Sequence, residues 1–194
     1  MPSLQAVFWD VDGTLAETEL QGHRLAYNRA FKDYGLDWIW DEDLYTELLT
    51  IPGGRQRMQS YGARLGQNLD ASALDRLRVI KQRHYLEVVA SGAVQLRPGV
   101  QDLLEELSAS GVQQWIVTSS GKASVEALLG SLNDDLSEAF QGMVTADDVD
   151  RHKPNPDPYL CALKWSEVPA TMHWPLKIQQ QVCSRLAAQV SVAC

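Results

Sequence analysis

Two aspartates stand one residue apart directly after a short apolar run near the start of the chain. The run Ala6–Trp9 is followed by Asp10-Val11-Asp12-Gly13-Thr14. An apolar run of this length predicts a buried strand, and the glycine predicts a turn at the strand's carboxyl end. Two carboxylates held together there repel each other and favour a cation, for which oxygen ligands indicate Mg²⁺. One carboxylate can then attack phosphorus while the other transfers a proton.

A calcium loop and a simple aspartate-rich turn are the alternatives to this chemistry. A calcium loop continues with further oxygen ligands at alternate positions. Leu15 and Ala16, the next residues after the motif, cannot be such ligands. We therefore favour a catalytic carboxylate pair.

The pattern after the first strand is helical over a long stretch without strands. Capping residues, terminal glycines and apolar spacing predict three helices in this stretch: Leu20–Tyr34 ending before Gly35, Glu42–Leu49 capped by Asp41, and a long helix from Ser72 to about Gly92. Alternation of helix and strand then begins. The predicted elements are a helix over Val100–Ser110, a strand over Gln114–Thr118, a helix from Lys122 and a short apolar run at Met143–Val144.

This order predicts an α/β protein with a doubly wound, Rossmann-like parallel sheet core and an inserted all-helical cap. We assign residues 1–15 and 93–194 to the core and residues 16–92 to the cap.

Composition narrows the range of partners. The 194 residues include 17 Lys and Arg against 25 Asp and Glu, a formal charge of −8, which argues against nucleic-acid binding because phosphate backbones require a basic surface. The first residues lack a basic signal region, and no apolar stretch is long enough to span a membrane. The three cysteines show no metal-binding spacing and are typical of a reducing compartment. We expect a monomer in a bacterial or plastid cytoplasm.

Two later motifs follow the aspartates in a fixed order. Thr118 ends the second predicted strand, and Lys153 is followed by Pro154. Alone, Thr-Ser-Ser at 118–120 is more typical of a loop or helix cap, and a single lysine is usually a solvated surface charge. Together with Asp10 and Asp12, the motifs resemble the haloacid dehalogenase-like hydrolase superfamily.

The resemblance implies a role for each motif residue. Asp10 would be the nucleophile that forms an aspartyl-phosphate, and Asp12 the general acid/base. Both would hold Mg²⁺, Asp12 through its backbone carbonyl. Thr118 would bind the phosphoryl group, and Lys153 would balance the charge of nucleophile and phosphate.

The predicted cap contains Glu17-Thr18-Glu19, Gly22-His23-Arg24 and Gly53-Gly54-Arg55-x-Arg57. With these motifs the chain resembles the CbbY-type sugar-phosphate phosphatases, and the resemblance runs from Ala6 to about Pro169. This implies a small sugar phosphate as substrate, such as xylulose 1,5-bisphosphate. The implied substrate-binding residues are Glu19, Tyr45, Gly53, Gly54, Arg57 and Ser119, with His23 and Arg24 as weaker candidates. For His23 and Tyr45, packing in an amphipathic helix face is an equal alternative. A phosphohexomutase of the same subfamily is the alternative activity.

The superfamily's fourth motif, an acidic pair after a late strand, is missing. The last 24 residues, Thr171 to Cys194, contain no Asp or Glu. Asp147 and Asp148 precede Lys153 and are therefore assigned to a turn or cap.

A reading-frame shift explains this tail. Reading the codons one base earlier from His173 forces Leu-Ala and permits Ile-Glu-Asp-Ser-Ala-Ala-Gly, with the acidic pair where Lys177 and Ile178 now stand, 24 residues after Lys153. We therefore predict a one-base deletion near Ala170, a disrupted C-terminal strand and helix, and impaired activity. An inactive sugar-phosphate-binding protein or a damaged gene product is the alternative from another functional class.

Overall fold

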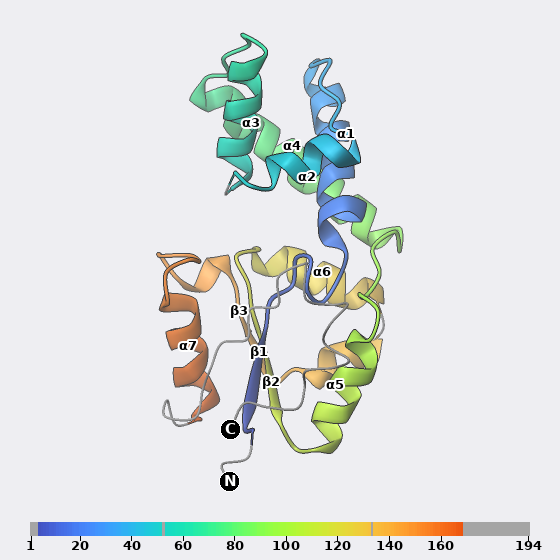
Figure 1. Cartoon of the computed structure of the whole chain (residues 1–194), viewed down its shortest axis with the longest axis vertical. Coiled ribbons are helices and arrows are strands. Elements are labelled where there is room, and N and C mark those ends of the chain that lie inside the picture. The colour runs from blue at the N-terminus through green and yellow to red at the C-terminus, as the bar shows by residue number, and fades with distance from the viewer. Residues whose placement is uncertain (1–3, 52, 133, 169–194) are drawn as a thin grey trace. The chain divides into compact units, whose positions relative to one another are not determined.

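The computed structural model describes residues 4–51, 53–132 and 134–168 (Figure 1). The chain divides into two compact units, with breaks after Thr18 and after Ala93. We call Glu19–Ala93 the helical unit and the remainder the sheet unit. That these units are a hydrolase core and its cap, divided at the sequence-based boundaries 15/16 and 92/93, remains our proposal. The predicted C-terminal strand and helix lie outside the described residues.

In its described residues, the sheet unit contains three parallel strands in the order β1-β2-β3. The strands are β1 (Ala6–Trp9), β2 (Gln113–Val117) and β3 (Gly142–Val144). Trp9 pairs with Ile116, and Ile116 pairs with Met143. Parallel strands end at the same edge of a sheet, so the residues that follow β1 and β2 are brought together there.

Helices lie on both faces of this sheet. Figure 1 shows α7 (Asp157–Ser166) on one face, and α5 (Val100–Ala109) and α6 (Lys122–Leu132) on the other. Phe8, Trp115, Val117 and Val144 form a buried cluster with Ala162 of α7. The predicted parallel α/β class is therefore confirmed.

Two 3₁₀ segments connect these elements: η2 (Asp134–Ala139) and η3 (Ala146–Asp148). Thr145 and Asp148 form a capping box at the start of η3. Asp147 accepts a hydrogen bond from the backbone N–H of Lys122 at 2.8 Å, where α6 begins. The assignment of both aspartates to a cap is correct.

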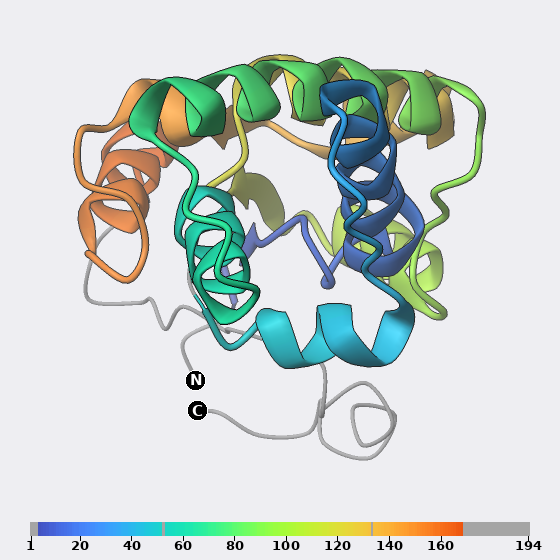
Figure 2. The same cartoon turned by 90° about the horizontal axis from the view of Figure 1, so that it is seen from above.

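The helical unit contains a π-helix, η1 (Glu19–Arg24), followed by α1 (Leu25–Tyr34), α2 (Glu42–Leu48), α3 (Gly54–Arg64) and α4 (Ala71–Ala90). Helix α1 crosses α4 and packs against it (Figure 2). Gly35 ends α1 at φ 84°, a conformation that favours glycine. The side chains of Asp41 and Asp70 accept hydrogen bonds at the starts of α2 and α4. The cap at Asp70 explains why α4 begins at Ala71 rather than at the predicted Ser72.

Helix α3 and the π turn were not expected from the sequence. The glycine pair at 53 and 54 weakens the local helix signal, because glycine has low helix propensity. Packing offsets this, since Arg57 and Met58 of α3 are both buried. The interior of the helical unit is largely aromatic, and its buried cluster includes Tyr27, Phe31, Trp38, Trp40 and Tyr45.

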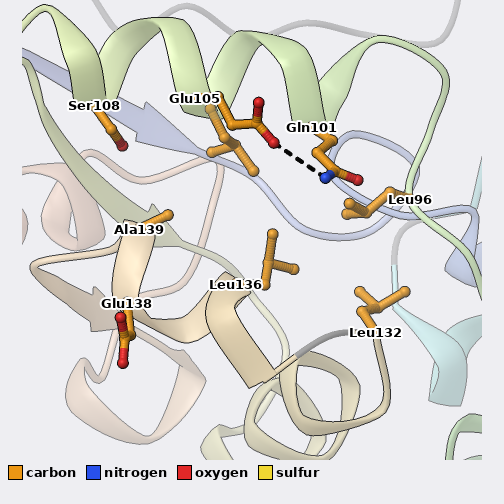
Figure 3. A pocket seen from close by; sticks show the side chains of 9 residues that line it. Leu96, Gln101, Glu105, Ser108, Leu132, Leu136, Glu138 and Ala139 are labelled. Atoms are coloured by element: carbon orange, nitrogen blue, oxygen red, sulfur yellow. Dashed lines mark hydrogen bonds between the residues drawn. The ribbon is translucent and has the colours of Figure 1, made fainter.

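A pocket of about 430 Å³ lies in the sheet unit between α5 and the segment that includes η2. Figure 3 shows leucines and the hydrogen-bonded pair Gln101 and Glu105 along its wall. None of the predicted site residues lines it. Among the described helices, none is long and apolar enough to cross a membrane.

Candidate active site

Asp10 lies at the carboxyl end of β1, held by a buried anchor. The preceding residue, Trp9, is buried, and its indole N–H donates to Oε1 of Gln114 on β2 at 3.1 Å. The amide nitrogen of Gln114 donates in turn to the carbonyl of Leu104 and the hydroxyl of Ser108. Because these buried polar groups are satisfied by several partners, the end of β1 is held rigidly.

One carboxylate oxygen of Asp10 has two donors. Its Oδ1 lies 3.0 Å from Nζ of Lys153 and accepts the backbone N–H of Val11 at 3.0 Å. The residues that the structure describes donate no hydrogen bond to Oδ2, so this oxygen is left for another reaction partner. The sequence places these two charges 143 positions apart, and the fold brings them together.

The pKa of the Asp10 carboxyl is raised. Burial is the main cause, and the charge of Asp12 adds to it, whereas Lys153 acts in the opposite direction by its charge and its hydrogen bond. This cluster therefore holds a carboxylate in an environment that favours added positive charge.

Replacing Lys153 with Met is expected to raise the pKa of Asp10 further. The substitution removes both the charge and the hydrogen bond that stabilise the ionised carboxylate. Carbon-detected NMR titration of the Asp10 carboxyl measures this directly. Lys164→Met, which removes an exposed lysine from α7, is the matched control and should leave the titration unchanged. An unshifted titration in Lys153→Met would show that the ion pair is absent in solution.

Asp12 is held by two hydroxyl groups from different parts of the sheet unit. Thr18 Oγ1 donates to Oδ1 at 2.7 Å, and Ser120 Oγ donates to Oδ2 at 2.5 Å. Thr18 is fully buried. Both hydroxyl groups fix the orientation of the Asp12 carboxylate, and neither residue was selected from the sequence.

Thr118 and Lys153 meet at the end of β2. Thr118 is buried, and its hydroxyl accepts the backbone N–H of Ser120 at 3.1 Å. Lys153 donates to the carbonyl of Val117 at 2.7 Å and lies over the ring of Tyr159. The structure therefore brings together Asp10, Asp12, Thr118 and Lys153. Ser119 is exposed, and its neighbour Ser120 is the serine that contacts Asp12.

A second polar cluster lies within the helical unit. Tyr45 donates its hydroxyl hydrogen to Oε2 of Glu19 at 2.8 Å and accepts a hydrogen bond from Nη1 of Arg57 at 3.3 Å. Arg57 is buried and also donates to the carbonyls of Leu48 and Ile51. Burial and the Glu19 charge raise the pKa of Tyr45 well above its usual value, so its hydroxyl keeps its proton. Tyr45 therefore links the two other predicted substrate-binding residues, Glu19 and Arg57.

The two predicted glycines begin helix α3. Gly53 has φ 81°, which side chains rarely adopt. Gly54 faces the hydroxyl of Tyr27, where a Cβ atom would lie 1.9 Å from the tyrosine oxygen. Burial raises the pKa of Tyr27 to about 12, against the opposing effect of Arg57, so this hydroxyl is also neutral.

Gly54→Ala is expected to destabilise the protein by about 1–3 kcal/mol, because the added methyl group overlaps the hydroxyl of buried Tyr27. Tyr27→Phe removes the overlapping oxygen, so the double variant should recover part of the loss. Urea unfolding measures both. Gly130→Ala in α6 is the control: its Cβ meets nothing within 4 Å, and it should be neutral or stabilising. Equal effects of the two alanine variants would contradict the expected overlap.

His23 and Arg24 lie on the π-helix with partners inside the helical unit. His23 stacks on Tyr85 with ring centroids 4.3 Å apart, and its Nδ1 lies 2.9 Å from Nζ of Lys81. Arg24 forms an ion pair with Glu42 at 3.0 Å. Lys81 is also within cation–π distance of Tyr27 and Tyr85. No sequence motif marks Lys81 as a candidate site residue.

The donor set fits a hard divalent cation only in part. Oδ2 of Asp10 receives no hydrogen bond from the described residues and is available to a cation, and Asp12 would add its backbone carbonyl oxygen. In the described part of the chain, no group of three or more His, Cys, Asp or Glu residues is arranged to hold a metal. The positions predicted to complete the ligand set, 177 and 178, lie outside the described residues.

Comparison with known proteins decides the family. Residues 7–172 match the haloacid dehalogenase-like hydrolases. The chain belongs to this family. The resemblance stated from its motifs is confirmed, and the family places the chain among the hydrolases.

Two similar proteins, one of them in two crystal structures, are informative for this family member. Protein CbbY of Rhodobacter capsulatus is 39% identical over 167 residues, which cover 86% of this chain and 73% of the relative. A crystal structure of CbbY from Rhodobacter sphaeroides in complex with phosphate has a TM-score of 0.76 at 34% identity, covering 88% of this chain and 76% of that one. A mutant of the same protein in complex with xylulose-(1,5)bisphosphate has a TM-score of 0.75 at 33% identity, with the same coverage.

Proposed function

We propose that this haloacid dehalogenase-like hydrolase is a phosphatase of small sugar phosphates that acts through an aspartyl-phosphate. The observation that carries the proposal is the Asp10–Lys153 pair, which joins a half-buried carboxylate to an ammonium group beside Thr118 at the ends of β1 and β2. The complex of a similar protein with xylulose-(1,5)bisphosphate supports the substrate class.

The nucleophile in this proposal is Oδ2 of Asp10, since Oδ1 is occupied by Lys153 and the N–H of Val11. Oδ2 attacks phosphorus as the bond from phosphorus to the sugar oxygen breaks. Asp12 donates a proton to the leaving sugar oxygen. Asp12 then takes a proton from water, whose oxygen attacks the aspartyl-phosphate and releases inorganic phosphate with restored Asp10.

Thr118 and Lys153 hold the phosphoryl group while its charge develops. The Thr118 hydroxyl can donate to a phosphoryl oxygen while it accepts the N–H of Ser120. The ammonium of Lys153 is already fixed by the Val117 carbonyl and therefore needs little reorganisation during the reaction. Mg²⁺, which Asp10 and Asp12 would hold, supplies neutralisation of phosphate charge when bound.

The helical unit supplies substrate contacts in this proposal. Arg57 has five N–H donors, and the described residues use three of them, which leaves two for a ligand. An arginine with free donors suits a distal phosphate group of a bisphosphate, with Glu19, Tyr45, Gly53 and Gly54 shaping the site beside it. His23 and Arg24 are weaker candidates, and Ser119 would contribute from the sheet unit. The likeness to CbbY proteins makes xylulose 1,5-bisphosphate the substrate to test first.

Phosphatase and phosphohexomutase activities differ in where the phosphoryl group goes. The protein with its predicted reading frame restored should release inorganic phosphate from xylulose 1,5-bisphosphate. With β-glucose 1-phosphate, it should form little glucose 6-phosphate. Phosphate release and sugar phosphates measured in the same reactions test this, and accumulation of glucose 6-phosphate without free phosphate would favour the mutase. The monomeric state and the cytoplasmic location stay predictions.

A further inference from the structure

The two chain segments that connect the units are paired with each other within the sheet unit. The backbone N–H of Glu17 donates to the carbonyl of Gln95 at 3.0 Å, and that of Arg97 donates to the carbonyl of Leu15 at 2.9 Å. The chain leaves the sheet unit after Thr18 and re-enters it at Val94, so these two segments flank the helical unit in the sequence.

The side chains of Glu17 and Arg97 join the same two segments. Arg97 Nη1 forms an ion pair with Oε2 of Glu17, and both side chains are largely buried, with 14% and 23% of their surface exposed. Nε of Arg97 and Oε1 of Glu17 are buried, and neither has a hydrogen-bond partner among the described residues. We call this ion pair the connecting latch.

The unused donor and acceptor belong to the same ion pair. Buried groups without partners are destabilising, and arginine commonly binds carboxylates through two parallel hydrogen bonds. Arg151 and Asp157 show that arrangement in this protein, with Nε–Oδ2 at 2.7 Å and Nη2–Oδ1 at 3.0 Å. A small sliding of the connecting segments would allow Nε and Oε1 of the connecting latch to pair as well.

The connecting latch is adjacent to a residue that orients Asp12. Thr18 follows Glu17 in the chain, is fully buried, and donates its hydroxyl hydrogen to Asp12 at 2.7 Å. A change in the backbone at Glu17 therefore reaches the Asp12 carboxylate through one residue.

We propose that Arg97 is a positioning residue for Asp12. The connecting latch has two states, with one or two hydrogen bonds, and exchange between them moves Thr18 and the carboxylate that it orients. This inference rests on the role proposed for Asp12 in proton transfer. Its test requires no turnover, so it is separable from a failure to hydrolyse sugar phosphates.

NMR relaxation dispersion on the full chain measures the exchange on the microsecond to millisecond timescale. We expect the Nε–H of Arg97 and the methyl group of Thr18 to exchange at the same rate. Arg97→Lys keeps the charge but has no planar fork, so the exchange contribution at Thr18 should be lost. Glu17→Gln should give the same loss, which provides a second variant if Arg97→Lys does not fold.

Arg151 provides the control for the two latch variants. Arg151→Lys removes an arginine whose two hydrogen bonds are already formed and should leave the exchange at Thr18 unchanged. A single environment for the Nε–H of Arg97 would overturn the proposal. Exchange at Thr18 that persists in both latch variants would overturn it as well.

Discussion

Insertion of one base near the codon of Ala170 is expected to raise magnesium-dependent phosphate release by at least about 10²-fold over the present 194-residue chain. The shifted frame places Glu and Asp where Lys177 and Ile178 stand, which adds two carboxylates and removes one positive charge. Loss of one partner from a buried charged cluster is worth about 3–5 kcal/mol, which sets this magnitude. Phosphate release from xylulose 1,5-bisphosphate, with and without Mg²⁺, measures the effect.

Insertion of three bases at the same place is the matched control. It lengthens the chain by one residue and leaves the acid-free tail unchanged, so activity should stay negligible. Strong magnesium-dependent turnover by the unrepaired chain would contradict the frameshift or the role assigned to the missing carboxylates. Isothermal titration separates the remaining alternatives: a binding protein should bind the bisphosphate without Mg²⁺, whereas a damaged enzyme should bind poorly or aggregate.

Asp10→Asn in the frame-restored protein is expected to abolish turnover, with a loss on the order of 10⁴-fold or more. The amide cannot form an aspartyl-phosphate, although its size and its contact with Lys153 are similar. Steady-state phosphate release measures the loss. Mass spectrometry after rapid acid quench should find a phosphorylated aspartate in the parent protein and none in the variant.

Asp157→Asn is the control for this substitution. Asp157 forms an ion pair with exposed Arg151, so the variant should retain nearly full activity. Full activity in Asp10→Asn would rule out the covalent route, because no other step in the proposal replaces the carboxylate nucleophile.

Several elements could be predicted from the sequence because their signals are local. The apolar run at Ala6–Trp9 and the cap at Asp41 act over a few residues, and each is found in the structure. Helix α3 is the counterexample. Its glycines oppose helix formation locally, and burial of Arg57 and Met58 in the helical unit outweighs that preference.

By itself, the sequence determined the order of motifs, the α/β class and the family, because residue type and spacing carry that information. Only the tertiary structure decided the contacts within the candidate site. In the structure, Ser120 rather than Ser119 donates a hydrogen bond to Asp12, and Lys153 contacts one oxygen of Asp10. Arg97 and Glu17 each keep one buried polar atom without a partner among the described residues. The physical reason is that hydrogen bonds depend on directions and distances between residues far apart in the chain, which parallel strand pairing fixes only after folding.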